Sequence, residues 1–336
     1  MRIRSPMLAA AAAVVAMTLG GAGAASAADK VSIMVGGIEK IIYLPAKLTE
    51  QLGYFKEQGL DVQLLSQPAG VQAENELLAG AVQGAVGFYD HSLDLQAKGK
   101  YIESVVQFSH APGEVELVAS RLAGQIKSPA DFKGRTLGVT GLGSSTNFLT
   151  QYLAEKHGVK SSEFTSLPVG AGNSFIAAMK QGKIDAGMTT DPTVARLLAT
   201  GEAKILIDMR TAAGTRAALG GVYPAACLYM ESRWVDAHKE ITQKLANAFV
   251  KTLHFIATHS AEEIADKMPT DYYAGDKAMY VKALAANKAM FTPDGKMPAD
   301  GPKTVLAVLS AFDKNVQGKT IDLAKTYTTA FVDAAH

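Results

Sequence analysis

The middle of the chain carries one pattern of apolar and polar positions twice. Residues 31–90 and 135–191 each open with a short apolar run that ends at glycine, and a segment with helical spacing of apolar side chains follows. A second apolar run, a second helical segment and a third apolar run complete each unit. Strands that alternate with helices indicate parallel βαβ units. The repeat therefore predicts an α/β protein with two lobes, each a mainly parallel sheet flanked by helices.

The best match between the two units lies where their second helices end. Residues 77–87 and 179–189 both pass from a helical segment through a glycine into a short apolar run. Glycine just past the last periodic residue is a helix C-terminal signal, because it adopts the left-handed backbone conformation without steric cost. We expect these segments to hold equivalent places in two facing lobes, with a ligand clamped between them.

Two further strand-like runs, 115–119 and 225–230, lie outside the repeated units, and we interpret them as the crossings between the lobes. On that interpretation residues 28–118 and 224–336 form lobe one, and residues 119–223 form lobe two. Residues 236–336 show mostly helical periodicity. We expect most of these helices to pack back on lobe one.

The first 27 residues have the features of a secretory signal peptide. Arg2 and Arg4 precede an apolar stretch, and residues 25–27 supply the small side chains that a signal peptidase reads. A membrane anchor is the alternative, but the stretch turns into glycine and alanine before the ~20 strongly apolar residues that a span needs. We expect residues 1–27 to be removed and the mature chain to lie in the periplasm, without membrane insertion.

Charge and composition exclude several classes of function. Without Arg2 and Arg4 the 33 basic residues become 31 and face 32 acidic ones, so no positive excess favours nucleic acid or an anionic membrane. The single cysteine, Cys227, allows neither an internal disulfide nor a thiolate metal cluster. His254 and His259 stand five positions apart, which does not place two metal ligands on one helix face. We expect a monomer with no cofactor, no metal and no catalytic residues.

In open parallel sheets, ligands bind beyond the carboxyl ends of the strands. This rule selects three loops from each unit: 37–43, 67–71 and 88–91 in the first, and 141–146, 169–173 and 189–191 in the second. The loop 141–146 combines glycines and hydroxyls with the free N–H groups of a helix start, which favours a carboxylate, sulfonate or phosphate. A plain helix cap by Ser144 or Ser145 is the alternative.

Aromatic and polar residues at these loops are further candidates. We expect Tyr43 and Tyr89 to reach the cleft, because tyrosine keeps a polar tip, whereas Phe88 is expected in the core. The pairs Asp90-His91 and Thr190-Asp191 follow strand ends, where a ligand contact, a solvated loop and, for Asp191, a helix cap are all compatible with the sequence. Three cations complement an anion in principle, but we expect solvent around each of them: Lys40, Arg210 and Arg216.

In several stretches the chain resembles the periplasmic substrate-binding proteins of bacterial ABC importers. The resemblance is to the nitrate/sulfonate/taurine branch, which shares its fold with thiamine-pyrimidine precursor proteins. The order and spacing of four segments carry it: 52–62, 77–87, 128–139 and 181–186.

This resemblance implies a type II-like periplasmic-binding-protein fold with two hinge crossings, and a membrane permease and an ATPase as partners. Together with Gly170 and His91 from the strand-end rule, the positions that match the cleft of the family form the set of expected ligand-binding residues: Ile41, Tyr43, Pro68, Ala69, Gly70, Tyr89, Asp90, His91, Gly143, Ser144, Ser145, Thr146, Gly170, Thr190 and Asp191.

Two departures from the family pattern narrow the function. Thr190 stands where relatives often carry an aromatic residue before Asp-Pro, and Cys227 alone does not support the cysteine-rich motif of the pyrimidine-synthesising relatives. We therefore expect a solute-binding protein for a small anionic or zwitterionic molecule of the sulfonate or carboxylate type, and not an enzyme. An exported enzyme on the same fold and a sensory module for a membrane receptor are the alternatives.

Overall fold

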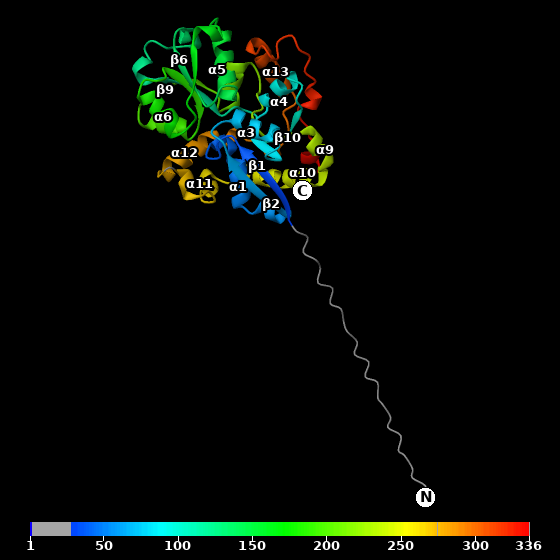
Figure 1. Ribbon diagram of the computed structural model, residues 1–336. Helices are drawn as coiled ribbons and strands as arrows, with labels where there is room; N and C mark the ends of the chain where they lie inside the picture. The colour runs from blue at the N-terminus through cyan, green and yellow to red at the C-terminus, as the bar shows by residue number, and fades with distance from the viewer. Residues whose placement is uncertain (2–27, 274, 336) are drawn as a thin grey trace.

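The structure, a computed structural model, describes residue 1, residues 28–273 and residues 275–335. The predicted signal peptide thus lies, apart from Met1, outside the described residues. The described chain forms two five-stranded sheets, each in its own lobe (Figure 1). This architecture confirms the predicted α/β fold with two lobes of sheet and helix.

The sheet of lobe one has the strand order β2-β1-β3-β10-β4. Strands β1, β2 and β3 are parallel, and β10 runs antiparallel to both of its neighbours. The strands are β1 Asp29–Val35, β2 Leu60–Ser66, β3 Gly84–Phe88, β4 Ile102–Gln107 and β10 Ala226–Glu231. Their connecting helices are α1 Leu44–Gln51, α2 Tyr54–Glu57, α3 Gly70–Leu78 and α4 Asp90–Ala97.

The sheet of lobe two repeats this plan in the order β7-β6-β8-β5-β9. Strands β6, β7 and β8 are parallel, and β5 is antiparallel to β8 and β9. The strands are β5 Glu114–Ala119, β6 Thr136–Val139, β7 Thr165–Pro168, β8 Ala186–Thr190 and β9 Ala203–Asp208. The helices are α5 Ser145–Lys156, α6 Asn173–Lys180, α7 Thr193–Ala199 and α8 Ala212–Leu219.

The expected boundary between residues 118 and 119 is wrong, because β5 belongs to lobe two over its whole length. Residues from Glu114 to Val118 pair with β8, and β9 covers the other edge. Lobe two therefore begins at about Glu114, and the chain crosses between the lobes in residues 108–113 and again before β10. An apolar run predicts a strand, but the sheet that it joins is decided by tertiary pairing, which local pattern does not encode.

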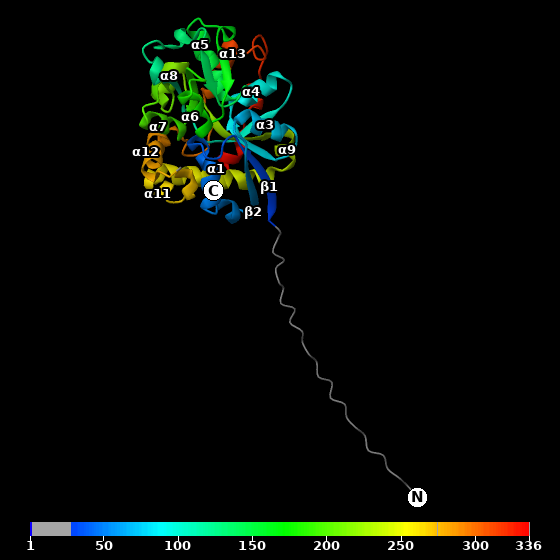
Figure 2. The same cartoon turned by 60° about the vertical axis from the view of Figure 1, so that its left-hand side comes forward.

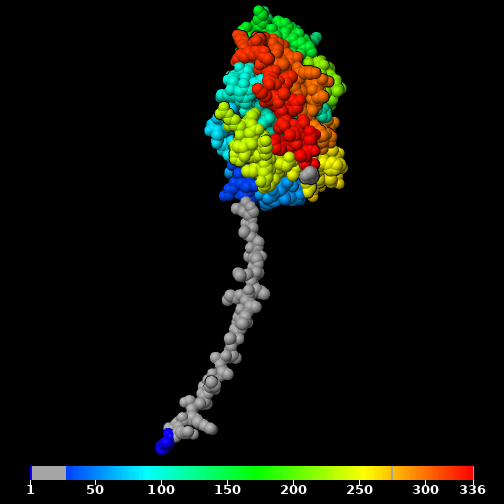
Figure 3. Space-filling view, turned by 90° about the vertical axis from the view of Figure 1, so that its right-hand side faces the viewer, coloured from blue at the N-terminus to red at the C-terminus, as the bar shows by residue number. Residues whose placement is uncertain are grey.

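The C-terminal helices connect both lobes and do not pack on lobe one alone. They are α9 Ser232–Ala237, α10 Lys239–Thr258, α11 Ala261–Ala265, α12 Lys277–Asn287, α13 Gly301–Phe312 and α14 Ala330–Asp333. Helix α10 lies on α1 and α2, where Phe249 contacts Phe55 at a ring-centroid distance of 5.3 Å. Helix α12 packs against α7, which Figure 2 shows directly above it, and α13 packs between α4 and α5. Along one side of the molecule the C-terminal segment runs from lobe two to lobe one (Figure 3).

Apolar packing is continuous across the contact between the lobes. The largest hydrophobic cluster fills lobe one and also includes Phe148, Leu149 and Leu153 of α5 and Met188 of β8, all from lobe two. Two smaller clusters lie inside lobe two, on the two faces of its sheet. The structure therefore shows the lobes closed on each other. In residues 28–273 and 275–335, no helix combines the length and apolar character needed to cross a bilayer.

Candidate functional site

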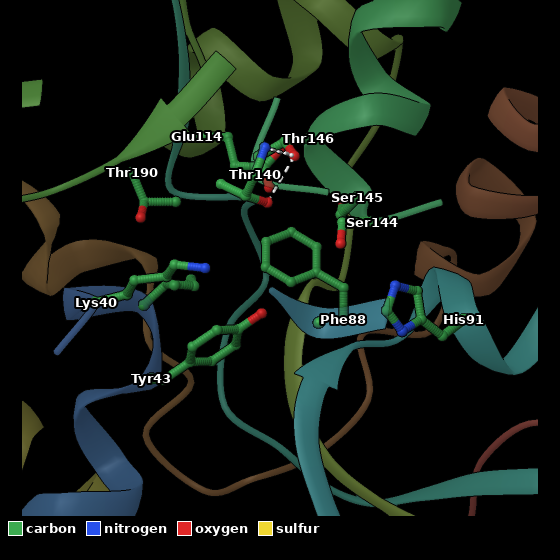
Figure 4. A pocket seen from close by; sticks show the side chains of 12 residues that line it. Lys40, Tyr43, Phe88, His91, Glu114, Thr140, Ser144, Ser145, Thr146 and Thr190 are labelled. Atoms are coloured by element: carbon green, nitrogen blue, oxygen red, sulfur yellow. Dashed lines mark hydrogen bonds between the residues drawn. The ribbon is translucent and has the colours of Figure 1, made fainter. Parts of the chain in front are cut away.

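A small pocket lies between the lobes, at the carboxyl ends of β1, β3, β6 and β8, where the strand-end rule places a ligand (Figure 4). The cavity between the closed lobes is only about 10 Å³, which is the space of about one water molecule. Both lobes line it: Lys40, Ile42, Tyr43, Gly70, Phe88 and His91 from lobe one, and Glu114, Thr140, Ser144, Ser145, Thr146 and Thr190 from lobe two. A solute held here would contact both lobes at once.

Lys40 supplies the positive charge of the pocket, although the sequence predicted it at the surface. Its side chain is buried, and Nζ donates hydrogen bonds to the carbonyl oxygens of Gly36 (2.6 Å) and Pro68 (3.0 Å). An ammonium group has three donors, so one N–H remains for a ligand. Burial lowers the pKa of Lys40 to about 8, and the nearby carboxylates of Glu39 and Glu114 partly offset that effect.

Tyr43 and Phe88 form the aromatic wall of lobe one. Their rings meet edge to face at a centroid distance of 6.2 Å, and the Tyr43 hydroxyl points into the pocket (Figure 4). Burial, together with Glu114 and Asp90, raises the pKa of Tyr43 well above its usual value, so the phenol stays protonated. Phe88, expected in the core, lines the pocket as well.

Tyr89 points away from the cleft, so its expected place in the ligand site is wrong. Its hydroxyl hydrogen-bonds to Thr326, and its ring packs edge-on against Tyr327 in lobe one. Successive residues at a strand end face opposite sides of a sheet, and Phe88 takes the side that faces the pocket. The sequence identifies the aromatic pair but does not show which member turns inward.

Glu114 is the principal pocket residue that the sequence analysis missed. It is the first residue of β5, is only 2% exposed, and stands beside Thr190 of β8 in the antiparallel ladder. Because β5 runs against its neighbours, its amino end reaches the edge at which the parallel strands finish. Burial, followed by the charge of Asp90, raises the pKa of Glu114 well above its usual range, while Lys40 opposes the shift. In the sequence, the only signal for this role was the position of the glutamate at the start of an apolar run.

Asp90 and His91 begin α4 next to the pocket. Asp90 Oδ2 accepts a hydrogen bond from the Tyr223 hydroxyl at 2.9 Å. His91 Nδ1 lies 3.0 Å from a carboxylate oxygen of Glu74, which holds the ring against the pocket. Burial raises the pKa of Asp90, and His91 and the hydroxyls of Ser145 and Tyr223 partly counteract it. Gly70 packs on this ring, since a Cβ there would lie 3.0 Å from His91 Cε1.

The hydroxyls of Ser144, Ser145 and Thr146 have three different environments. Ser144 occupies the N-cap position of α5 without a capping bond, and its Oγ instead accepts the N–H of Val71 across the lobe interface at 3.2 Å. Thr146 Oγ1 accepts the N–H of Thr140 at 3.0 Å. Ser145 Oγ is buried and has no partner with hydrogen-bond geometry among the described residues, although its hydroxyl lies close enough to Asp90 to lower the pKa of that carboxyl. The plain-cap alternative therefore does not describe Ser144.

Thr190 lines the pocket, whereas the neighbouring Asp191 has a structural role. Thr190 lines the pocket with an unpartnered hydroxyl in the described part of the chain. Asp191 is buried outside the lining: its side chain accepts from Ala195 N (2.9 Å), Arg210 Nη1 (3.2 Å) and Asn287 Nδ2 (2.7 Å). Arg210, expected in solvent, is therefore a half-buried partner of Asp191, and the Asp191 carboxylate is directed to the protein and not to the pocket.

Five other expected ligand residues surround the site without lining it. Ile41 donates its N–H to the carbonyl of Asp191 at 3.0 Å, and the Pro68 carbonyl receives Lys40. A Cβ added to Gly141 would lie 3.0 Å from the Cβ of Ala69, so these two residues are in close contact. Gly143 and Gly170 have positive φ angles of 83° and 69°. Of these residues, Ile41 and Ala69 contact the opposite lobe.

Comparisons with known proteins agree with this architecture. Residues 43–263 match the protein family described as NMT1/THI5 like, which is more than half of the chain. The chain belongs to the NMT1/THI5-like family. A solved structure of a protein from Bordetella bronchiseptica RB50 is 37% identical, covers 91% of this chain and 96% of that chain, and superposes with a TM-score of 0.88.

The alkanesulfonate-binding protein SsuA from Xanthomonas axonopodis pv. citri, bound to MOPS, shares the fold of this family member. It is 19% identical with a TM-score of 0.73, and the match covers 91% of this chain and all of that chain (100%). The predicted relation to the thiamine-precursor-like family and the predicted periplasmic-binding-protein fold are confirmed.

Among curated proteins, the 4-amino-5-hydroxymethyl-2-methylpyrimidine phosphate synthase THI13 of Saccharomyces cerevisiae is 28% identical over 163 residues. The match takes in 48% of this chain and 46% of the yeast protein, so the chain spans about half the length of the curated relatives it matches. In the described ranges, no group of three or more His, Cys, Asp or Glu side chains is arranged to hold a metal ion.

Proposed function

We propose that this protein is the solute-binding component of an ABC importer, which captures a small anionic or zwitterionic organic molecule between its lobes. The observation that carries the proposal is a pocket in which each lobe offers buried polar atoms without partners in the described chain. These atoms are His91 Nε2 from lobe one, and Glu114 Oε2, Ser145 Oγ and Thr190 Oγ1 from lobe two. Buried polar groups are normally satisfied, so this set favours a bound solute as the missing partner.

The acid group of the solute is assigned to the side of Lys40 and the start of α5. Lys40 has one N–H not used by Gly36 and Pro68, and the Ser145 hydroxyl also lines the pocket. Ser145 and Thr146 are the first residues of a helix of 12 residues, whose leading N–H groups have no intrahelical acceptor. Tyr43 and Phe88 then contact the remainder of the molecule.

Capture works by closure. A solute that contacts both lobes stabilises the closed state, whereas a solute that contacts one lobe binds the open and closed states equally and shifts nothing. Direct hydrogen bonds between facing loops, such as Ile41 N to Asp191 O and Val71 N to Ser144 Oγ, join the lobes once they meet. The closed surface would then be presented to a permease and its ATPase, with the mature protein acting in the periplasm as a monomer.

Small-angle X-ray scattering combined with a thermal-shift screen tests this function. We expect a sulfonate, carboxylate, amino acid or heterocycle that raises the melting temperature to reduce the radius of gyration as well. Lys40→Gln should weaken the binding of an acid-bearing compound. A binder that leaves the radius of gyration unchanged would contradict capture by closure.

An enzyme activity is the second candidate, because the curated yeast relatives are named as pyrimidine phosphate synthases. Cys227, the single cysteine, is fully buried in the core of lobe one and is not part of the pocket lining. Mass spectrometry of each binder before and after incubation with the protein separates the two functions. Unchanged compound favours capture, and a new product favours the enzyme.

A further inference from the structure

We propose that residues 287–312 form a strap that contacts both hinge segments and stabilises the closed state from outside the pocket, so that a share of the empty protein is already closed. We call these residues, from the end of α12 to the end of α13, the C-terminal strap. The strap would regulate the same closing motion by which we propose that the protein captures a solute, so its role rests on that function.

The strap pairs with the first crossing between the lobes, residues 108–113. Ser109 and Phe291 form an antiparallel β-bridge. Two backbone hydrogen bonds flank this bridge: His110 N to Met290 O at 3.0 Å, and Thr292 N to Phe108 O at 2.8 Å. A hinge absorbs a change of backbone angles when the lobes move, and this pairing opposes such a change.

The second crossing, between α8 and β10, packs against the start of α13. A Cβ added to Gly301 of the strap would lie 2.6 Å from Cδ of Pro224. A Cβ added to Gly221 of the crossing would lie 2.5 Å from Oγ1 of Thr304. The strap and this crossing are therefore in close contact at two points, and the strap touches both segments that connect the lobes.

The middle of the strap is attached to lobe one. Gln107, the last residue of β4, donates its N–H to the carbonyl of Gly295 at 2.8 Å, and its own carbonyl accepts from Thr292 Oγ1 at 2.5 Å. A Cβ added to Gly295 would lie 2.9 Å from Val106 of β4 and 3.2 Å from Val250 of α10. We therefore expect the strap to stay with lobe one when the lobes move.

The two ends of the strap contact lobe two. At one end, Asn287 Nδ2 donates to Asp191 Oδ2 at 2.7 Å. At the other, α13 packs on α5 as well as on α4 (Figures 1 and 2), and the ring centroids of Phe312 and Phe148 lie 6.0 Å apart. None of these four side chains lines the pocket. Because the strap is attached to lobe one, opening of the lobes would separate these contacts.

Contacts that exist only in the closed state lower its free energy whether or not a solute is bound. The closed lobes leave a cavity of about 10 Å³, the space of about one water molecule. The strap contacts therefore hold the lobes together without an organic molecule between them. A solute then adds to a closure that the strap already favours.

Double electron–electron resonance on the empty protein tests the strap. Lys56→Cys in lobe one and Lys183→Cys in lobe two give two exposed positions for spin labels. Cys227 is fully buried, and burial raises the pKa of its thiol, so it does not take up a label. We expect a closed population at short label distance. Asn287→Ala and Phe312→Ala should each lower the ratio of closed to open molecules about two- to tenfold, since each removes a hydrogen bond or an aromatic contact.

Asn247→Ala and Phe255→Ala are the matched controls. Both residues lie on α10, and their partners are in lobe one: Asn247 Nδ2 donates to Gln58 Oε1 at 3.0 Å, and Phe255 stacks on His259 at 3.7 Å. These variants should keep the wild-type ratio of closed to open molecules. Circular dichroism should show all four variants folded.

The same labels, read with and without a compound that raises the melting temperature, separate the strap from solute capture. A wild-type protein with no closed population, or strap variants with the wild-type ratio, overturns the strap. If the compound still closes the wild-type protein, solute capture stands. A closed population that falls in both strap variants, while no compound enlarges it, supports the strap and counts against solute capture.

Discussion

Two buried carboxylates beside the same cleft, those of Asp191 and Glu114, have opposite surroundings. Asp191 accepts hydrogen bonds from Ala195, Arg210 and Asn287, and thereby joins β8 and α7 of lobe two to the C-terminal helix α12. Glu114 lies at the adjacent strand end and has one oxygen without a partner in the described chain. Burial alone therefore does not identify a ligand residue. The difference is whether the protein itself satisfies the charge.

This contrast also predicts opposite effects on stability. A buried carboxylate with an arginine and an amide as partners holds the closed arrangement, and removing it leaves the half-buried Arg210 less well compensated. An unsatisfied carboxyl lowers the stability of the empty protein, and substitution by its amide relieves that cost. Functional sites often retain such unfavourable groups.

The largest expected effect tests Asp191 as a structural residue. Asp191→Ala should lower the free energy of unfolding by about 2–4 kcal/mol, because Arg210 and Asn287 lose a shared buried acceptor. Urea denaturation followed by circular dichroism measures the change. Asp208→Ala is the control, since that more exposed carboxylate also pairs with Arg210 and should cost less than about 1 kcal/mol. An equal loss of unfolding free energy in the two variants would contradict a structural role specific to Asp191.

The next effect concerns the pH dependence of the unsatisfied carboxyls on β5. Burial raises the pKa of Glu116 from 4.5 to about 8, with an opposing contribution from the Thr150 hydroxyl. The folded state therefore binds more protons than the unfolded state between pH 4.5 and 8, and stability falls as pH rises through this window. Glu116→Gln should reduce that fall by roughly 1–3 kcal/mol, measured by urea denaturation at pH 5 and pH 8. A variant with the wild-type pH profile would show that Glu116 does not titrate in this range.

Lys40 provides a third test, through affinity and not stability. Its pKa of about 8 means that the ammonium loses its proton as pH rises through 8. For an acid-bearing compound with no titration of its own between pH 7 and 9, affinity should fall by up to about tenfold over that interval. Lys40→Gln should bind more weakly at pH 7 and show a flat profile by calorimetry. An unchanged pH profile in Lys40→Gln would place the acid group elsewhere.

The smallest effects distinguish the two serines at the start of α5. Ser144→Ala removes the acceptor of Val71 N and should make closure less favourable by about 0.5–1.5 kcal/mol for every ligand. Ser145→Ala should weaken the binding of acid-bearing compounds by a similar amount and leave the radius of gyration of the empty protein unchanged. Scattering and calorimetry on both variants measure these effects. Identical behaviour of the two variants would show that the hydroxyls act together.

The sequence predicted the architecture well because the architecture is periodic and duplicated. Alternating apolar runs and helix-ending glycines such as Gly80 and Gly182, both at positive φ, mark the same elements in both lobes. The rule that ligands lie beyond strand ends then located the loops that meet at the pocket. These features depend on local chemistry and chain direction, which a single sequence contains.

Individual side chains were harder to place, because their roles depend on partners far along the chain. Lys40 is held in the interior by hydrogen bonds to the carbonyl oxygens of Gly36 and Pro68. The Asp191 carboxylate accepts a hydrogen bond from Asn287, 96 positions away. Tyr89 turns outward to Thr326, 237 positions away. Glu114 enters the pocket only because β5 joins lobe two in the antiparallel direction. No local pattern encodes these pairings.

A crystal structure of the protein with the compound that raises its melting temperature most tests the central claim most directly. The account predicts that the compound lies between the lobes, in contact with residues of both, with its acid group near Lys40 Nζ. A compound bound to one lobe only, or with its acid group placed away from Lys40, would contradict the account.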